Sequence, residues 1–308
     1  MQISAKILAD STFDGGPRIT TLELHYHRYI LPEFNTHRAF SRNGASSRAI
    51  PTHKLIEQAI AERVEPLEWG LNQAGMQAFT VADEALEAEG RAIWDEARAS
   101  AIFHATRLND KGFAKQIVNR VLEPFLSTRT VVTSTDWANF MALRDHKDAQ
   151  PEIRELARQI IAAMEGSKPA LLQKGQWHLP YILPEDYDRI HKMPFADRAE
   201  LTAKIKPLLN WVSDAFIFGD ADLILLMVSA ARCARVSYRT VEGTATDYVK
   251  DLELFDRLVR AQPVHASPTE HQASPYAIGR DYTTANYRNW APFRRMLEGE
   301  TVHDKLTF

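Results

Sequence analysis

The clearest pattern of hydrophobic and polar positions lies in residues 19–27, ITTLELHYH, where the two kinds alternate. Leu22, Leu24 and Tyr26 fall on one face, and the residues between them are polar. A two-residue period is typical of a β-strand that buries one face. We therefore predict a strand over 19–27.

Spacings of three and four residues, which predict helices, are common in the rest of the chain. Residues 52–109 are rich in Ala, Glu, Leu and Arg and are interrupted by Pro66 and Gly70, so we predict several helices there. Apolar residues also recur at helical steps between Pro151, which suits a first helical turn, and Gly166, which suits a helix end. One helix is predicted between these two residues.

Prolines and glycines interrupt the second half of the chain. Residues 166–184 hold three prolines and two glycines, which predicts irregular packed chain. Residues 197–211 predict a helical region that Pro207 kinks or splits. Residues 251–261 predict another helix, which ends before Pro263.

The apolar residues of 223–234 occupy every face of a helix, and this predicts that the helix is buried. Asp222 is placed to cap its start. Arg232 and Arg235 are expected to reach solvent from its far end. Cys233 lies inside it and is expected to be an inert core thiol rather than a nucleophile.

No internal repeat or low-complexity linker divides the chain, so the elements favour one α+β domain of intertwined segments, residues 1–308, with more helix than strand. The chain has 37 Lys and Arg against 40 Asp and Glu, and 45% of its residues are hydrophobic. This balance is typical of a soluble protein without general attraction for membranes or direct contact with nucleic acid. The longest apolar run, residues 223–228, is too short to span a bilayer. A single cysteine excludes an internal disulfide and fits a cytoplasmic setting.

Several well-known chemical motifs are absent. The sequence has no GxGxxG turn for a dinucleotide, no GxxxxGK[ST] phosphate loop and no HExxH zinc motif. The pair Glu270 and His271 has Ser267 where an inverted zinc motif needs a histidine. We therefore expect no metal site.

Residues 36–49, THRAFSRNGASSRA, form a cationic stretch with three arginines, one histidine and four hydroxyl side chains. No acid occurs between Glu33 and Glu57. Arginine forks and serine hydroxyls are the groups that bind a phosphate monoester, because their hydrogen bonds replace its lost hydration. The alternative interpretation is a solvated basic loop.

Two further clusters carry polar groups beside predicted elements. Arg144 follows an apolar run, so its guanidinium should emerge from buried structure and suit negative charge on a substrate oxygen. A salt bridge to Asp145 or Asp148 is the structural alternative. Residues 263–275, PVHASPTEHQASP, place hydrogen-bonding groups on a proline-stiffened turn, or else form a helix cap with surface histidines. These groups are His265, Ser267, Glu270 and His271.

Together these clusters resemble the flavin-dependent thymidylate synthases. The family pattern RHRxxSxNExSxRY is similar to residues 36–49, and NFxxLRxxxxAQxEI is similar to residues 139–153. The elements HxSPxEH and AARVSY resemble residues 265–271 and 230–238. In the first pattern the matching residues are His37, Arg38, Ser41, Asn43, Ser46 and Arg48.

The order of these elements differs from the family's usual order. The last two normally precede the RHR pattern and here follow it, so the chain resembles a circularly permuted, bacteriophage-type member. The matched segments are 18–50, 112–154 and 229–294, and the helical additions 52–110 and 166–222 have no matching counterpart. The resemblance implies a helix-rich α+β fold around a mostly antiparallel sheet. It also implies a homotetramer with shared active sites, in the host cytoplasm if the chain is phage-encoded.

The chemistry implied is transfer of a one-carbon unit from methylenetetrahydrofolate to carbon 5 of a pyrimidine deoxynucleotide monophosphate. FAD is the implied cofactor and NADPH the implied reductant. Arg144 is the implied catalytic residue, and either Asn119 or Arg120 is expected to contact the nucleotide. The implied substrate-binding residues are Ser46, Ser47, Arg48, Asn119, Arg120 and Arg144, and the implied flavin-binding residues are His37, Arg38, Asn43, Asn139, Ser237, His265, Ser267 and Glu270.

Three positions depart from the family pattern. Thr36 replaces its first arginine, Gly44 its glutamate and Ala49 its tyrosine. Methylation of dUMP to dTMP is the favoured reaction. Hydroxymethylation of dUMP or dCMP for phage DNA modification is the nearest alternative, and a catalytically silent flavin or nucleotide binder is the third.

Overall fold

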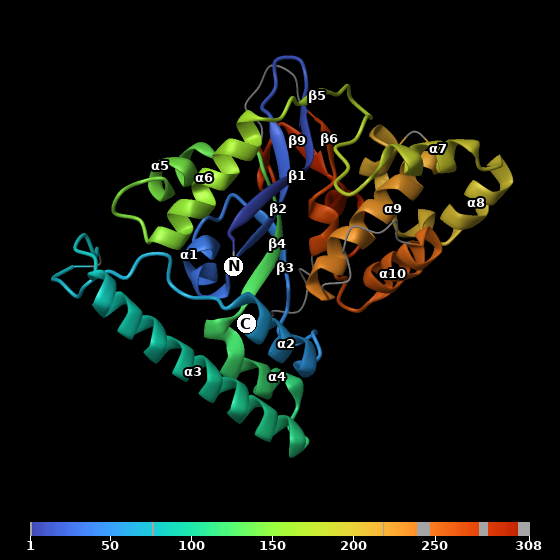
Figure 1. Ribbon diagram of the computed structural model, residues 1–308. Helices are drawn as coiled ribbons and strands as arrows, with labels where there is room; N and C mark the ends of the chain where they lie inside the picture. Colours follow the sequence, from blue (N-terminus) through green and yellow to red (C-terminus); the bar gives the residue numbers. More distant parts are fainter. Residues whose placement is uncertain (1, 76, 218, 239–246, 277–282, 301–308) are drawn as a thin grey trace, which may run out of the picture.

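The computed structural model describes residues 2–75, 77–217, 219–238, 247–276 and 283–300. In this part of the chain the main sheet has five strands in the order β3-β4-β2-β1-β5 (Figure 1). All its pairs are antiparallel except the short pair of β1 with β5, so the fold is α+β with a mixed sheet. The strands are β1 (Ser4–Thr12), β2 (Ile19–His27), β3 (Ser41–Gly44), β4 (Ser127–Ser134) and β5 (Ala170–Leu171).

Strand β2 is central and has the predicted bounds. Leu22, Leu24 and Tyr26 are fully buried, as the alternation predicts, and they pack against the helix α6 (Pro151–Glu165). His27 on the opposite face is also buried, because helices cover both faces of the sheet. Figure 1 shows α6 on one side of the strands and α9 on the other.

Helix α9 (Asp220–Arg235) confirms the predicted buried helix, since every residue from Leu223 to Ala234 is buried. Its N-cap is Gly219, so Asp222 lies inside the first turn and the predicted cap was wrong. There the carboxylate is close to the positive end of the helix dipole.

The expectation that the arginines of α9 reach solvent was also wrong for Arg232. This side chain is buried and its guanidinium donates to both Asp186 oxygens, at 2.5 and 2.9 Å, and to Asp251 at 3.0 Å. Arg235 donates to the other oxygen of Asp251 at 2.8 Å. These ion pairs join α9 to α7 (Pro184–Lys192) and α10 (Tyr248–Arg260).

The predicted helices in residues 52–109 are α2 (Thr52–Glu62) and α3 (Glu84–Asp110), and Pro66 and Gly70 lie between them as expected. Of the residues of α3, all of which the structure describes, only Ala105 is buried. The helix lies along the outside of the molecule below the sheet (Figure 1). The outer face of α3 is therefore exposed to solvent in a single chain.

The two other predicted helical regions, 197–211 and 251–261, are helical in the structure but begin or end at different residues. The region predicted at 197–211 is α8 (Phe195–Ala203) followed by short 3-10 turns, because Pro207 has no backbone N–H to continue a helix. Helix α10 begins three residues earlier than predicted, since Asp247 caps it by accepting from the Val249 backbone. The other elements are α1 (Leu31–Asn35), α4 (Lys115–Val118), α5 (Ala138–Arg144), β6 (Ala273–Pro275), β7 (Thr283–Thr284), β8 (Tyr287–Arg288) and β9 (Trp290–Pro292).

Strand β3 is where distant parts of the sequence meet. It forms one edge of the sheet and contacts two 3-10 turns, Val236–Tyr238 and Ser267–Glu270. The residues matched to the family in 229–294 include 239–246 and 277–282, which lie outside the described residues. Within the described part, no helix is long and apolar enough to cross a membrane.

Candidate functional site

A cavity of about 420 Å³ lies beside β3. Asn43 from β3, Ser237 from the turn after α9, and His265 and Ser267 from the turn after α10 all line it. The structure therefore brings together four of the predicted flavin-binding residues from three separate stretches of sequence. The rest of the lining consists of Ala234, Leu258, Val264, Ala266, Pro268 and Arg294.

Asn43 contributes a buried amide side chain to the wall of this cavity. Its Nδ2 atom has no hydrogen-bond partner among the described residues and almost no accessible surface. Polar groups of Ser237, His265, Ser267 and Arg294 also line the cavity. This polar lining fits a cofactor with ring carbonyls and nitrogens, such as a flavin.

Glu270 is oriented by an arginine that the sequence motifs did not indicate. Arg294 lines the cavity, forms an ion pair with Glu270 and donates to Glu300 at 2.7 Å. Burial lowers the pKa of Arg294, but hydrogen bonds to Glu300 and Glu270 outweigh it and raise the pKa overall. Arg294 lies 24 positions after Glu270, and no short motif connects them.

A second cluster forms around Arg144, at the end of α5. Its Nε donates to His37 Nε2 at 3.0 Å, and its Nη2 donates to Thr36 Oγ1 at 3.2 Å. Burial and the neighbouring guanidinium of Arg144 lower the pKa of His37, so the ring is neutral and able to accept. Asp145 forms its ion pair with Arg158. The alternative prediction, a salt bridge between Asp145 and Arg144, is therefore wrong.

Thr36, which departs from the family pattern, belongs to this cluster. Its hydroxyl accepts from Arg144 and donates to the Glu33 carbonyl at 2.7 Å. Arg38 and Asn139 are exposed on the neighbouring loop and on α5, and neither lines the cavity.

The third cluster is the loop after β3. Asn119 is fully buried and its Nδ2 donates to the carbonyls of Ser47 and Ile50, at 2.6 and 3.1 Å, so it holds the loop from inside. Arg120 is more than half exposed and donates to Glu123 at 2.8 Å. Of the two predicted nucleotide contacts, Arg120 is therefore the one that faces solvent.

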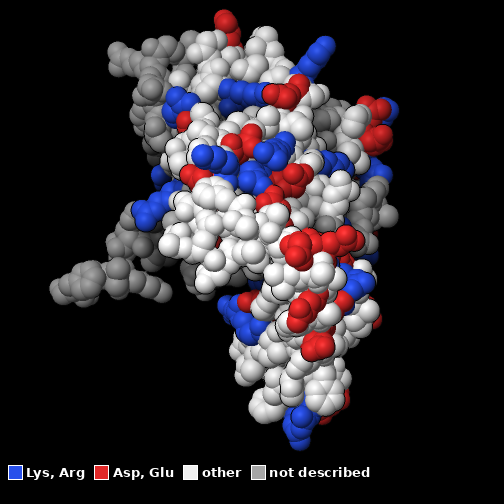
Figure 2. Space-filling view, turned by 60° about the vertical axis from the view of Figure 1, so that its left-hand side comes forward, with Lys and Arg blue, Asp and Glu red and all other residues white. Residues whose placement is uncertain are grey.

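The same loop reaches the cavity through its backbone. Ser46 N donates to the Ser237 carbonyl at 3.1 Å, and Ser237 lines the cavity. Arg48 is exposed and forms no ion pair with any residue that the structure describes. Basic and acidic side chains are interspersed on the face of the molecule shown in Figure 2.

The Arg144 cluster and the loop of Ser46, Ser47 and Arg48 lie at opposite ends of β3. His37 precedes this strand and Ser46 follows it, while β4 runs antiparallel beside it. The predicted catalytic residue and the predicted phosphate loop therefore lie beyond different ends of a four-residue strand.

Buried histidines join the cavity region to the sheet. Thr133 Oγ1 lies 2.8 Å from His271 Nδ1 and 2.6 Å from Thr21 Oγ1, which in turn lies 2.7 Å from His178 Nε2. Burial lowers the pKa of both histidines to about 3, so they are neutral near pH 7. Burial also raises the pKa of the Cys233 thiol, in agreement with its predicted inert role.

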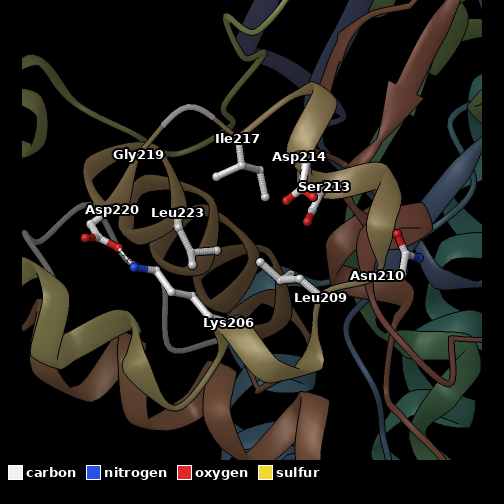
Figure 3. Close-up of a pocket in the computed structure, with 9 residues that line it drawn as sticks. All are labelled: Lys206, Leu209, Asn210, Ser213, Asp214, Ile217, Gly219, Asp220 and Leu223. Atoms are coloured by element: carbon white, nitrogen blue, oxygen red, sulfur yellow. Dashed lines mark ion pairs between the residues drawn. The ribbon is translucent and has the colours of Figure 1, made fainter.

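Another cavity, of about 440 Å³, is lined by residues between Lys206 and Leu223 and by none of the predicted site residues. Figure 3 shows Lys206 reaching toward Asp220 on one side, with Ser213 and Asp214 on the other. The Lys206 and Asp220 charges neutralise each other at 2.6 Å. No group of three or more metal-ligating side chains occurs among the described residues.

Comparison with known proteins gives one family match. Residues 19–170, just under half of the chain, match the family model described as thymidylate synthase complementing protein (Thy1). Two solved structures of a UMP/dUMP methylase, PolB from Streptomyces cacaoi, one bound with 5-Br UMP and one with 5-Br dUMP, are 17% and 15% identical. The matches cover 53% of this chain and 88% and 90% of theirs, with TM-scores of 0.43 and 0.42. No curated protein sequence matches the chain.

Proposed function

We propose that this chain, whose residues 19–170 match the Thy1 family model, transfers a one-carbon unit from methylenetetrahydrofolate to carbon 5 of a pyrimidine deoxynucleotide. Methylation of dUMP to dTMP is the reaction we favour. The observation that carries the proposal is the cavity where Asn43, Ser237, His265 and Ser267 meet. We further propose that residues 229–294 complete a single permuted domain with this region.

We assign the cavity residues to FAD, which when bound supplies reducing equivalents drawn from NADPH. Asn43, Ser237, His265 and Ser267 all offer polar side chains in the wall of the cavity. Glu270 is held by Arg294 beside them. Arg144 would stabilise the negative charge that develops on the pyrimidine ring carbonyls. Its hydrogen-bond partners His37 and Thr36 are neutral, so they fix the direction of the guanidinium without neutralising its charge.

The product decides between the remaining alternatives. Purified protein is incubated with FAD, NADPH, methylenetetrahydrofolate and either dUMP or dCMP, and the nucleotide is analysed by mass spectrometry. A methyl increment on dUMP is expected. A hydroxymethyl increment on either nucleotide would favour the DNA-modification alternative, and ligand binding without any product would favour the silent binder.

We expect Arg48→Ala to raise the KM for dUMP by about 10- to 100-fold, because a charged hydrogen bond is worth about 1.5–3 kcal/mol. The KM for deoxyuridine should not change, since the nucleoside has no phosphate. The comparable variant Arg257→Ala, at an exposed arginine on α10, should leave both values unchanged. Equal effects of Arg48→Ala on both substrates would reject a phosphate contact.

We propose a homotetramer with shared sites, in which Arg144 of one subunit serves a nucleotide held by the loop of another. The separation of the two clusters along β3 supports this sharing. The outer face of α3 supports contact between copies, since Ile93 and Phe103 are 60% and 58% exposed. An antiparallel pairing of two copies centred near residue 98 would set Ile93 against Phe103 and Glu89 against Arg107.

Ile93→Lys is accordingly expected to reduce the oligomer to a smaller species, because the charge cannot be buried against an apolar partner. The mass in solution, measured by light scattering after size-exclusion chromatography, checks this result. Phe195→Lys, at a position on α8 that is 74% exposed, is the matched control and should keep the native mass. An unchanged mass for Ile93→Lys would rule out this face as a contact.

A further inference from the structure

Three donors from different elements converge on one carboxylate oxygen, Oε1 of Glu123. Ser47 Oγ donates to it at 2.7 Å and Arg120 Nη1 at 2.8 Å. Arg28 Nη2 lies 3.2 Å from the same atom. Arg28 follows β2, Ser47 follows β3, and Arg120 and Glu123 lie in the 3-10 turn Asn119–Phe125.

This donor set has the composition of a phosphate site. Two guanidiniums and a hydroxyl aimed at one point are the groups that bind a phosphate oxygen. The two arginines carry two positive charges against the single negative charge of Glu123, so the cluster keeps a net positive charge. A nucleotide monophosphate with a dianionic phosphate matches that charge better than one carboxylate does.

Burial makes the counter-charge necessary. The Arg28 side chain is only 13% exposed and its Nη1 donates to the Ala45 carbonyl at 3.1 Å, so it is fixed beside the loop. An arginine in this position is costly without an anionic partner. Glu123 is 25% exposed, and its carboxylate can therefore turn toward solvent when another anion takes its place.

We propose that Glu123 is a built-in counter-anion of the phosphate subsite, and that Arg28 binds the phosphate together with Ser47 and Arg120. Without nucleotide, Glu123 keeps the donors in position. With nucleotide, the phosphate displaces the carboxylate, so Glu123 sets the affinity for phosphorylated substrates. This inference rests on the proposed function, because it assigns the same loop to a nucleotide phosphate.

The test is Glu123→Gln in the full-length protein, which removes the charge but keeps an amide oxygen that accepts from Ser47. Binding of dUMP, deoxyuridine and inorganic phosphate is measured by calorimetry, without turnover. We expect the Kd for dUMP and for inorganic phosphate to fall by about tenfold, the scale of removing one competing charge near the surface. The Kd for deoxyuridine should not change.

Glu62→Gln is the matched control, since Glu62 on the nearby α2 is 27% exposed and accepts from Gln58 outside the cluster. It should leave all three Kd values unchanged. Unchanged or weaker dUMP binding by a folded Glu123→Gln protein would overturn the counter-anion and leave a purely structural ion pair. Tighter binding of inorganic phosphate without any binding of dUMP would support the counter-anion and reject the proposed function.

A second variant covers the case in which Glu123→Gln does not fold. Arg28→Gln removes one of the three donors and leaves Glu123 paired with Arg120. We expect it to weaken binding of dUMP and inorganic phosphate by about tenfold, while deoxyuridine binding stays the same. Equal binding of dUMP by this variant and the native protein would remove Arg28 from the site.

Discussion

Replacing Arg144 with lysine is expected to lower kcat by about 10²- to 10³-fold, the usual effect of losing one oriented donor at a developing charge. Lysine keeps the positive charge but loses the planar fork, in which Nε and Nη2 donate separately to His37 and Thr36 and fix the direction of the guanidinium. The rate of product formation from dUMP, measured at saturating substrate, checks this expectation. The KM for dUMP should change much less than kcat.

Two controls separate the catalytic role of Arg144 from cofactor binding and from a general loss of structure. The flavin absorbance of the purified Arg144→Lys protein should match that of the native protein, which separates catalysis from cofactor binding. Arg158→Lys alters a neighbouring exposed arginine that pairs with Asp145, and it should retain native turnover. Unchanged turnover by Arg144→Lys with flavin bound would exclude the proposed catalytic role.

Asp251→Ala is expected to lower the free energy of unfolding by about 3–5 kcal/mol, the range for breaking a buried ion pair from one side. Asp251 is fully buried and accepts from both Arg232 and Arg235. Its removal leaves Arg235 without this partner and Arg232 with only Asp186 as its acidic partner among these pairs. Urea unfolding followed by circular dichroism measures the change.

Asp256→Ala on the same helix provides the comparison. Asp256 pairs with Arg260 one turn away, and both side chains are partly exposed. An exposed pair of this kind contributes about 0.3–0.5 kcal/mol. If Asp251→Ala is no more destabilising than Asp256→Ala, the buried network does not hold α9 and α10 together.

An element can be predicted from the sequence when its burial leaves a regular pattern of apolar residues. Strand β2 could be predicted because apolar and polar positions alternate along it, and α9 because apolar residues occupy all its faces. Strand β4, STRTVVTS, has hydroxyl residues on buried positions of both faces and shows no apolar alternation. Its place beside β2 is set by contacts across more than 100 positions, such as Thr21 with Thr133. Local sequence does not contain that information.

The candidate site likewise contains residues that the sequence predicted and residues that it did not. Asn43, Ser237, His265 and Ser267 lie in recognisable motifs, and the resemblance predicted them without any knowledge of the cavity. Glu123 carries no such signal, because its role comes from Ser47, which lies 76 positions earlier. The inward orientation of Asn119 depends likewise on two loop carbonyls that are distant in sequence.

The buried chain of hydroxyls and histidines between Thr21, Thr133, His178 and His271 has a consequence for synthesis of the protein. The ribosome delivers β1, β2 and β4 well before His271, which lies 138 positions after its partner Thr133. During that interval Thr133 lacks its partner His271 on this face of the sheet. Contacts between such distant residues form slowly, because a long loop must close first. We therefore expect the nascent chain to stay aggregation-prone until its last third has been translated.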